Sequence, residues 1–187
     1  AAVEFERAAL RARRDVSVAR VDGQKTRVDV PRTLAALPAP PAVDGWPVRA
    51  FRLRMDAEGR WFINDWNFHD TGQEPVFTVR RGAREVWEIR NSMTSMPHPI
   101  HLHGFGFRVV SRSISPPDVR ARSVAANGLG PQDLGVGDTV VVWPGEIVRV
   151  AVDFAQPFSG TQRYMLHCHN LEHEDMGMML TFAVVDT

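Results

Sequence analysis

The sequence predicts an all-β protein, built as a sandwich or a barrel. Short stretches of the chain alternate apolar and polar residues, as strands with one buried face do. Glycine and proline punctuate these stretches, and the 187 residues include 14 glycines and 13 prolines. Many short strands joined by turns of this kind are typical of sandwiches and barrels.

Two features precede the main run of strands. Residues 16–21 and 26–30 flank an Asp-Gly turn at 22–23, and we expect them to pair as a hairpin. Residues 31–47 then carry five prolines with small residues between them. Since proline disrupts helices, this segment predicts an extended linker.

From Val48 onward the alternation returns, with apolar residues at 51, 53 and 55 facing away from two arginines at 52 and 54. Further strands are expected at 61–63, 76–79, 85–90, 101–110, 139–143, 146–154, 164–169 and 179–185. Residues 111–137 contain the Pro116-Pro117 pair and four glycines, which predicts a long surface loop. A short helical turn is expected at 171–175.

Composition excludes several classes of function. Lys+Arg and Asp+Glu each total 22, so the formal net charge is zero and nothing favours a nucleic-acid partner. No apolar run is long enough to span a membrane. One cysteine excludes an internal disulfide framework. The chain begins at Ala1 without a signal-like segment, which fits a processed chain or an excised piece of a longer one.

The only cysteine, Cys168, lies between His167 and His169. On a strand the two histidines face one side and the cysteine faces the other. His173 and Met178 follow, and a cysteine, a histidine and a weak thioether make most of the set that suits an electron-transfer copper. One tripeptide can therefore serve two metal sites, with its backbone as a short path for an electron.

The remaining histidine of such a set lies upstream, in the run His98-Pro99-Ile100-His101-Leu102-His103. Alternation places His101 and His103 on one strand face. His98 lies just before the expected strand, between two prolines, and is free to turn elsewhere. Six of the seven histidines fall in these two windows, which leaves an outer set of His98, Cys168, His173 and Met178.

The segments HPIHLHG (98–104) and HCHNLEHEDMGMM (167–179) resemble the two copper motifs in the C-terminal domain of multicopper oxidases. That family includes laccases, bilirubin oxidases and bacterial cuprous oxidases. The resemblance includes DTVVVWPGEIVRVAVDF (138–154) and covers roughly residues 48–185. It implies a cupredoxin-like Greek-key β-sandwich at 48–187, a linker at 31–47, and the tail of a preceding cupredoxin domain at 1–30.

The resemblance also implies the copper ligands. Type 1 copper would be held by His98, Cys168, His173 and Met178. Type 2 copper would bind His101, and the type 3 pair would bind His103, His167 and His169. Met176 and Met179, which flank the axial position, are expected to be packing residues, and His69 a structural or surface histidine.

The implied activity is that of an oxidase. A phenol, an aromatic amine or a metal ion would give single electrons to type 1 copper, through a solvent-facing edge of His98 or His173. Cys168 would pass them to His167 and His169, and so to a trinuclear cluster that reduces O2 to water. Glu174 matches an acidic position on a proton path, although a solvated carboxylate is the alternative.

Three other residues near the motifs have two interpretations each. Asp175 would contact a substrate metal ion or remain solvated. Met93 and Met96 would be soft ligands for cuprous ion or packing residues.

The cluster needs four further histidines, and only His69 is unassigned. The expected partners are therefore N-terminal cupredoxin domains, on the same precursor or on a second chain, besides O2 and a small reducing substrate. By resemblance, the protein would be periplasmic or extracellular.

The alternative function is a one-copper electron-transfer cupredoxin, which has no use for the two His-X-His pairs. A copper nitrite reductase is disfavoured because it lacks the second histidine beside the cysteine, here His169. Zinc is disfavoured because structural zinc sites usually contain several cysteines. A scaffold that has lost copper is disfavoured because all the ligands are present.

Overall fold

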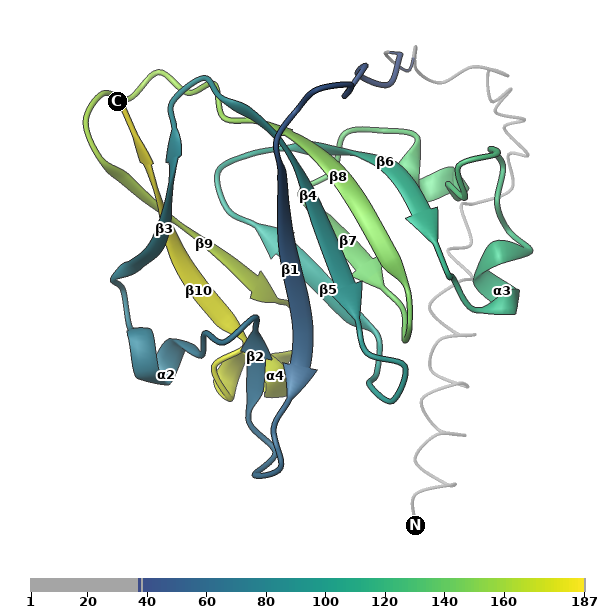
Figure 1. Cartoon of the computed structure of the whole chain (residues 1–187), viewed down its shortest axis with the longest axis horizontal. Helices are drawn as coiled ribbons and strands as arrows, with labels where there is room; N and C mark the ends of the chain where they lie inside the picture. The colour runs from purple at the N-terminus through teal and green to yellow at the C-terminus, as the bar shows by residue number, and fades with distance from the viewer. Residues whose placement is uncertain (1–36, 38, 187) are drawn as a thin grey trace, which may run out of the picture. The chain divides into compact units, whose positions relative to one another are not determined.

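Two five-stranded sheets enclose one apolar core (Figure 1). This computed structural model describes residue 37 and residues 39–186. Leu37–Thr187 form one compact unit. The prediction of an all-β, cupredoxin-like sandwich is confirmed. Among the described residues, no helix is both long and apolar enough to cross a membrane.

The first sheet has the order β2-β1-β4-β8-β6. Its strands are β2 (Trp61–Ile63), β1 (Val48–Met55), β4 (Arg84–Asn91), β8 (Ile147–Asp153) and β6 (Phe107–Ser113). The second sheet has the order β3-β10-β9-β5-β7. Its strands are β3 (Pro75–Arg80), β10 (Met179–Val185), β9 (Gln162–Cys168), β5 (His98–Leu102) and β7 (Thr139–Val142).

Consecutive strands from β2 to β9 repeatedly switch sheets, so the connections cross the sandwich. The crossings gather loops from distant parts of the sequence at the two ends of the sheets (Figure 1). Short helices lie in these connections: α2 (Phe68–Thr71), α3 (Pro117–Arg120) and the 3-10 helix η1 (Pro131–Asp133). A further helix, α4 (Leu171–Asp175), joins β9 to its neighbour β10 in the same sheet. The helical turn predicted at 171–175 is confirmed.

The core is held by apolar and aromatic side chains from the facing sheets. Trp87 of β4 packs on Phe51 of β1 with ring centroids 4.8 Å apart. Phe77 of β3 stacks on Phe182 of β10 at 5.4 Å. Each such pair contributes about 0.5–1.5 kcal/mol beyond the area it buries. The apolar residues of the predicted alternating pattern are therefore the ones that fill the core.

The single strand predicted at 101–110 is wrong. β5 ends at Leu102 and β6 begins at Phe107, and the two strands lie in different sheets. Gly104 makes the break with φ of 77°, and a Cβ there would lie 2.4 Å from the Tyr164 ring. A side chain at this position would face both backbone strain and a clash.

Two other predictions concern less regular segments. The loop predicted at 111–137 begins inside β6 but is otherwise irregular apart from α3 and η1. Of the predicted linker, residues 39–47 form no helix or strand. The hairpin predicted at 16–30 lies outside the described residues, and the assignment of residues 1–30 to a preceding domain stays a prediction.

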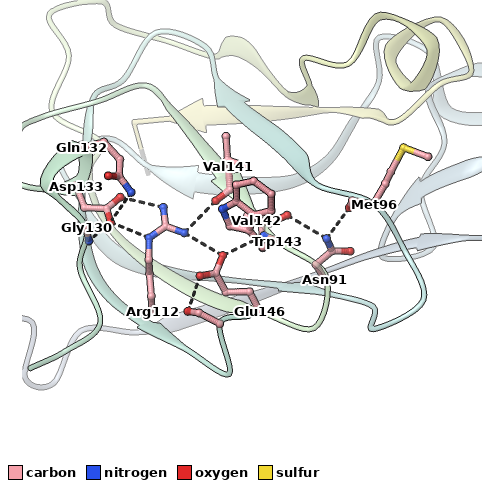
Figure 2. Close-up of polar contacts among 11 residues, drawn as sticks. Asn91, Met96, Arg112, Gly130, Gln132, Asp133, Val141, Val142, Trp143 and Glu146 are labelled. Carbon is pink, nitrogen blue, oxygen red and sulfur yellow. Dashed lines mark hydrogen bonds and ion pairs between the residues drawn. The ribbon is translucent and has the colours of Figure 1, made fainter. Parts of the chain in front are cut away.

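A buried ionic network joins the edge strands β6 and β7 (Figure 2). Arg112 donates from Nε and Nη2 to Asp133 Oδ2 and Oδ1, at 2.8 and 2.9 Å. Its Nη1 donates to Glu146 Oε2 at 2.9 Å and to the Val141 carbonyl at 3.0 Å. The three charged side chains are 3%, 2% and 0% exposed. Burial opposes the charge of Arg112, but both carboxylates raise the pKa of its guanidinium.

The same network reaches the loop that precedes β5. Glu146 accepts from the Trp143 backbone N–H at 3.0 Å and from Ser115 Oγ at 2.6 Å. Asn91 donates its backbone N–H to the Glu146 carbonyl at 3.0 Å. Its side-chain Nδ2 donates to the carbonyls of Met96 and Val142 (Figure 2). The charged cluster thus connects β6, the edge strand of one sheet, to β7, the edge strand of the other, and through Asn91 it also reaches the loop before β5.

The segment after β9 is held by a second buried amide. Asn67, the N-cap of α2, donates from Nδ2 to the carbonyls of Trp61 and Met176, both at 2.8 Å. The Phe68 N–H donates to the Gly177 carbonyl at 2.9 Å. His69 contributes a third contact, since its Nε2 lies 2.9 Å from the Asp175 carbonyl and must donate to it. This contact gives His69 the structural role expected from the sequence.

Replacing Arg112 with methionine should destabilise the protein by about 3–5 kcal/mol, because two buried carboxylates lose their cation. Arg84→Met is the matched control, since Arg84 pairs with Asp153 on the surface and exposed pairs contribute about 0–1 kcal/mol. Urea unfolding of both variants measures the difference. Equal losses of stability would show that the network is not a structural anchor.

Gly177→Ala should loosen the segment between β9 and β10. Gly177 has φ of 86°, and an added Cβ would lie 2.4 Å from the Asn67 side chain. The backbone strain alone costs about 1–3 kcal/mol, and the clash adds to it. Gly59→Ala is the control, because Gly59 has φ of 82° but no heavy atom within 4 Å of the added Cβ. Thermal unfolding should show the larger loss of stability for Gly177→Ala. Equal losses of stability would show that close packing of Gly177 against Asn67 does not hold this segment.

Candidate metal centre

Pairing between β5 and β9 sorts the histidines and the cysteine onto two faces. Ile100 pairs with Cys168 and His101 pairs with His167. Because side chains alternate along each strand, Cys168 faces the core with Ile100, and His101 and His167 share the opposite face. His98 is the first residue of β5 rather than a residue before it, so the same alternation places it with Cys168.

On the core side, three side chains that could hold a metal ion converge. Cys168 Sγ lies 3.6 Å from His98 Nδ1 and 3.4 Å from His173 Nδ1. The two Nδ1 atoms are 3.1 Å apart. All three residues are buried. We call this set the thiolate cluster; it comes from β5, the end of β9 and α4.

Met178 and Trp61 surround the thiolate cluster. Met178 is fully buried, and its carbonyl accepts from the Cys168 N–H at 3.0 Å. Its own N–H donates to the His173 carbonyl at 2.8 Å. Trp61 packs over the His173 ring with centroids 4.1 Å apart and contacts His98 edge-on at 5.2 Å. The backbone therefore holds Met178 between the cysteine and the histidine.

Burial sets the protonation of this cluster. It lowers the pKa of His98 to about 4, with a further contribution from the nearby His173. Burial also lowers the pKa of His173. Burial raises the pKa of the Cys168 thiol to about 11. At neutral pH both imidazoles are therefore neutral and can bind a metal ion, which would displace the thiol proton.

Four imidazoles meet on the opposite face and form a second set, which we call the imidazole cluster: His101, His103, His167 and His169. Nε2 of His103 lies 2.9 Å from Nε2 of His167. His101, His167 and His169 each offer a nitrogen within 4.8 Å of the others. His169 is exposed, and a groove runs past His101 and His103. The set is therefore open to solvent at His169 and along the groove, whereas His167 is buried.

Hydrogen bonds orient two of these rings. His101 Nδ1 lies 3.1 Å from the Asp138 carbonyl, which only accepts, and 2.9 Å from Thr139 Oγ1. His167 Nδ1 lies 3.1 Å from the Cys168 carbonyl and 3.5 Å from Glu174 Oε2. Both rings thus carry their proton on Nδ1 and leave an Nε2 lone pair for a ligand. Burial also lowers the pKa of His167.

The structure places the other candidate residues around these clusters. Met96 Sδ lies 3.0 Å from His173 Nε2. Met93 is largely exposed and packs on Gly145. Met176 is exposed, and Met179 begins β10, where it pairs with His167.

The expected solvent-facing edge on His98 or His173 is wrong. The two residues are 0% and 2% exposed. The loop before β5 covers them, because Ser95 Oγ lies 2.8 Å from His98 Nε2 and Met96 reaches His173. Sequence reasoning missed Ser95 and Trp61. The three-residue spacing from Ser95 to His98 was visible in the sequence, whereas nothing local links Trp61 to a histidine more than one hundred residues away.

Comparisons with known proteins show which family this chain is similar to. The family profile for multicopper oxidases matches residues 47–187. A laccase of Haloferax volcanii is 38% identical over 160 residues, which cover 81% of this chain and 25% of the laccase. A bilirubin oxidase of Albifimbria verrucaria is 38% identical over 155 residues, which cover 82% of this chain and 24% of the oxidase.

A solved structure shows the same fold. The McoA multicopper oxidase from the hyperthermophile Aquifex aeolicus superposes with a TM-score of 0.70 and 36% identity. The match covers 84% of this chain and 33% of that protein. The chain thus spans about a quarter to a third of the length of these relatives. With the profile covering most of its length, the chain belongs to the multicopper oxidase family.

Proposed function

We propose that this chain is the C-terminal part of an oxidase that takes single electrons from a reducing substrate and delivers them to O2, which is reduced to water. The observation that carries the proposal is the tripeptide at 167–169. It supplies the cysteine of the thiolate cluster and two histidines of the imidazole cluster. The segment 98–103 does the same, with His98 in the thiolate cluster and His101 and His103 in the imidazole cluster, but only the tripeptide contributes the cysteine.

The donor atoms fit copper. A thiol, a thioether and neutral imidazoles are soft or borderline ligands that suit it, and the thiolate cluster has one cysteine where structural zinc sites usually have several. Bound copper would supply one-electron transfer at the thiolate cluster and oxygen reduction at the imidazole cluster. The type 1 ligands proposed are His98, Cys168, His173 and Met178. His101 is proposed for type 2 copper, and His103, His167 and His169 for the type 3 pair.

Two routes connect the clusters through this chain. One is covalent, along the backbone from Cys168 to its neighbours at 167 and 169. The other passes through the Cys168 carbonyl, which accepts a hydrogen bond from His167 Nδ1–H at 3.1 Å. Both routes begin at the same side chain, so we assign Cys168 the central role in electron transfer, with His167 and His169 as the receiving residues.

Glu174 is proposed as a proton carrier for oxygen reduction. Its carboxylate lies 3.5 Å from His167 Nδ1, and its side chain is 31% exposed. A group that touches the imidazole cluster and also reaches solvent can bring in protons from outside. A solvated carboxylate without this role remains the competing interpretation, although contact with His167 favours the first.

The rest of the oxidase is proposed to come from N-terminal cupredoxin domains, on the same precursor or a second chain. The exposed face of the imidazole cluster and the groove beside it are where their histidines would complete the cluster. A phenol, an aromatic amine or a metal ion is the proposed class of substrate. A periplasmic or extracellular location is part of the same proposal.

A one-copper electron carrier is the competing function, because the thiolate cluster alone would suffice for it. It would leave four converging imidazoles without a role. Copper content separates the two: an electron carrier would hold one copper per protein, whereas the oxidase would hold four.

Cys168→Ser in the copper-loaded, full-length protein should abolish the visible absorption of the thiolate-copper bond. Substrate oxidation should fall by more than about 100-fold, because changes to residues behind the ligands already cost about 10–100-fold. Absorption spectroscopy, copper analysis and oxygen uptake measure these effects. Copper at the imidazole cluster should persist, which provides an internal control for folding.

His101→Ala is the reciprocal control. It should retain the visible absorption, and a reducing substrate should still bleach that absorption without O2, while oxygen uptake is lost. Substrate oxidation at the normal rate in Cys168→Ser would contradict the proposed electron path. Loss of the visible absorption in His101→Ala would contradict the division into two sites.

A further inference from the structure

The loop between β4 and β5, residues 92–97, touches the outer nitrogens of both histidines in the thiolate cluster. Ser95 Oγ lies 2.8 Å from His98 Nε2. Met96 Sδ lies 3.0 Å from His173 Nε2. The inner nitrogens of the same rings, both Nδ1, approach Cys168 Sγ. Each ring therefore has one nitrogen toward the candidate ligand site and one toward this loop.

This arrangement has a consequence for the tautomer of each ring. A neutral imidazole carries one proton, and it can bind a metal through Nδ1 only when that proton is on Nε2. A serine hydroxyl and a thioether sulfur can both accept a hydrogen bond from Nε2–H. Because a thioether only accepts, the contact with Met96 favours the tautomer that leaves Nδ1 of His173 free for a metal. The Ser95 hydroxyl can either donate or accept, so its contact is compatible with the same tautomer of His98.

Asn91 holds the loop in place. Its side-chain N–H groups donate to the Met96 carbonyl at 2.8 Å and to the Val142 carbonyl at 3.0 Å (Figure 2). Val142 is the register partner of His98 in the neighbouring strand. Asn91 is 7% exposed and its Oδ1 is buried without a partner, so the amide acts only as a donor. One side chain thus ties the loop to the strand that positions His98.

Other polar side chains of the loop behave differently. Ser92 Oγ and Thr94 Oγ1 are 3.2 Å apart, and the Thr94 N–H donates to Ser92 Oγ. Both residues are exposed and neither contacts a histidine in the described structure. Ser95 is partly buried and turns toward His98. The contact with the ring is therefore specific to one hydroxyl and is not general to the loop.

We propose that Ser95 is a positioning residue for His98, that Met96 has the same role for His173, and that Asn91 fixes both through the loop backbone. The inference rests on the proposed function, since it assumes that the two histidines bind copper through Nδ1. Residues that hold the outer nitrogen of a histidine ligand typically change metal affinity by about 10–100-fold when removed. They also tune the electronic properties of the metal.

The test compares three variants of the copper-loaded, full-length protein. Ser95→Ala removes the hydroxyl on His98, Ser92→Ala makes the same change elsewhere in the loop, and Ser95→Thr restores the hydroxyl. We expect Ser95→Ala to bind copper at the thiolate cluster about 10-fold more weakly, with a shifted reduction potential and electron paramagnetic resonance spectrum. Ser92→Ala should match the unchanged protein, and Ser95→Thr should recover most of the loss.

Two results would overturn the inference in distinguishable ways. If Ser95→Ala matches Ser92→Ala in affinity, potential and spectrum, the positioning role is wrong while the copper site stands. If the unchanged protein shows no thiolate-copper absorption when loaded, the proposed function fails and the inference fails with it. Asn91→Asp, which loses the donor groups at nearly constant size, should reproduce the shift. Ser95→Ala decides the question even if Asn91→Asp does not fold.

Discussion

The register of β5 against β9 is the constraint on which both candidate sites depend. Ile100 opposite Cys168, and His101 opposite His167, put one set of ligands in the core and the other on the outer face. A slip of one residue would exchange the faces of a whole strand. It would turn the cysteine toward the outer face and polar imidazoles toward the core. The packing that excludes such a slip therefore also keeps the two clusters on opposite sides of one backbone.

The rest of the fold supports that register from its edges. The buried network around Arg112 joins β6, β7 and the turn at Glu146, and Asn91 extends it to the loop over His98. On the other side, Asn67 holds the segment that carries His173 and Met178. Two buried amides, Asn91 at the end of β4 and Asn67 at the start of α2, thus fix the two loops that complete the thiolate cluster. Supporting contacts of this kind hold ligand side chains close to one geometry before a ligand binds.

Much of this arrangement is predictable from the sequence, and the exceptions have a common cause. Alternation and spacing identified both clusters, the strands around them and the turn at α4, because those signals are local. The break at Gly104 was missed because a glycine inside an alternating run does not reveal that Tyr164 fills the space beside it. The burial of His98 and His173 was missed because it depends on Trp61 and on a loop whose course is set by Asn91. Contacts between segments that are distant in the sequence cannot be predicted from the local pattern of either segment.

Copper-edge anomalous diffraction from crystals of the copper-loaded, full-length protein would locate each copper relative to these side chains. We expect one copper among Cys168 Sγ, His98 Nδ1 and His173 Nδ1. We also expect separate copper peaks beside the imidazole cluster on the opposite face. Copper bound away from these residues, or a single ion shared by the two faces, would contradict the assignment of Cys168 to one copper site and of His167 and His169 to another.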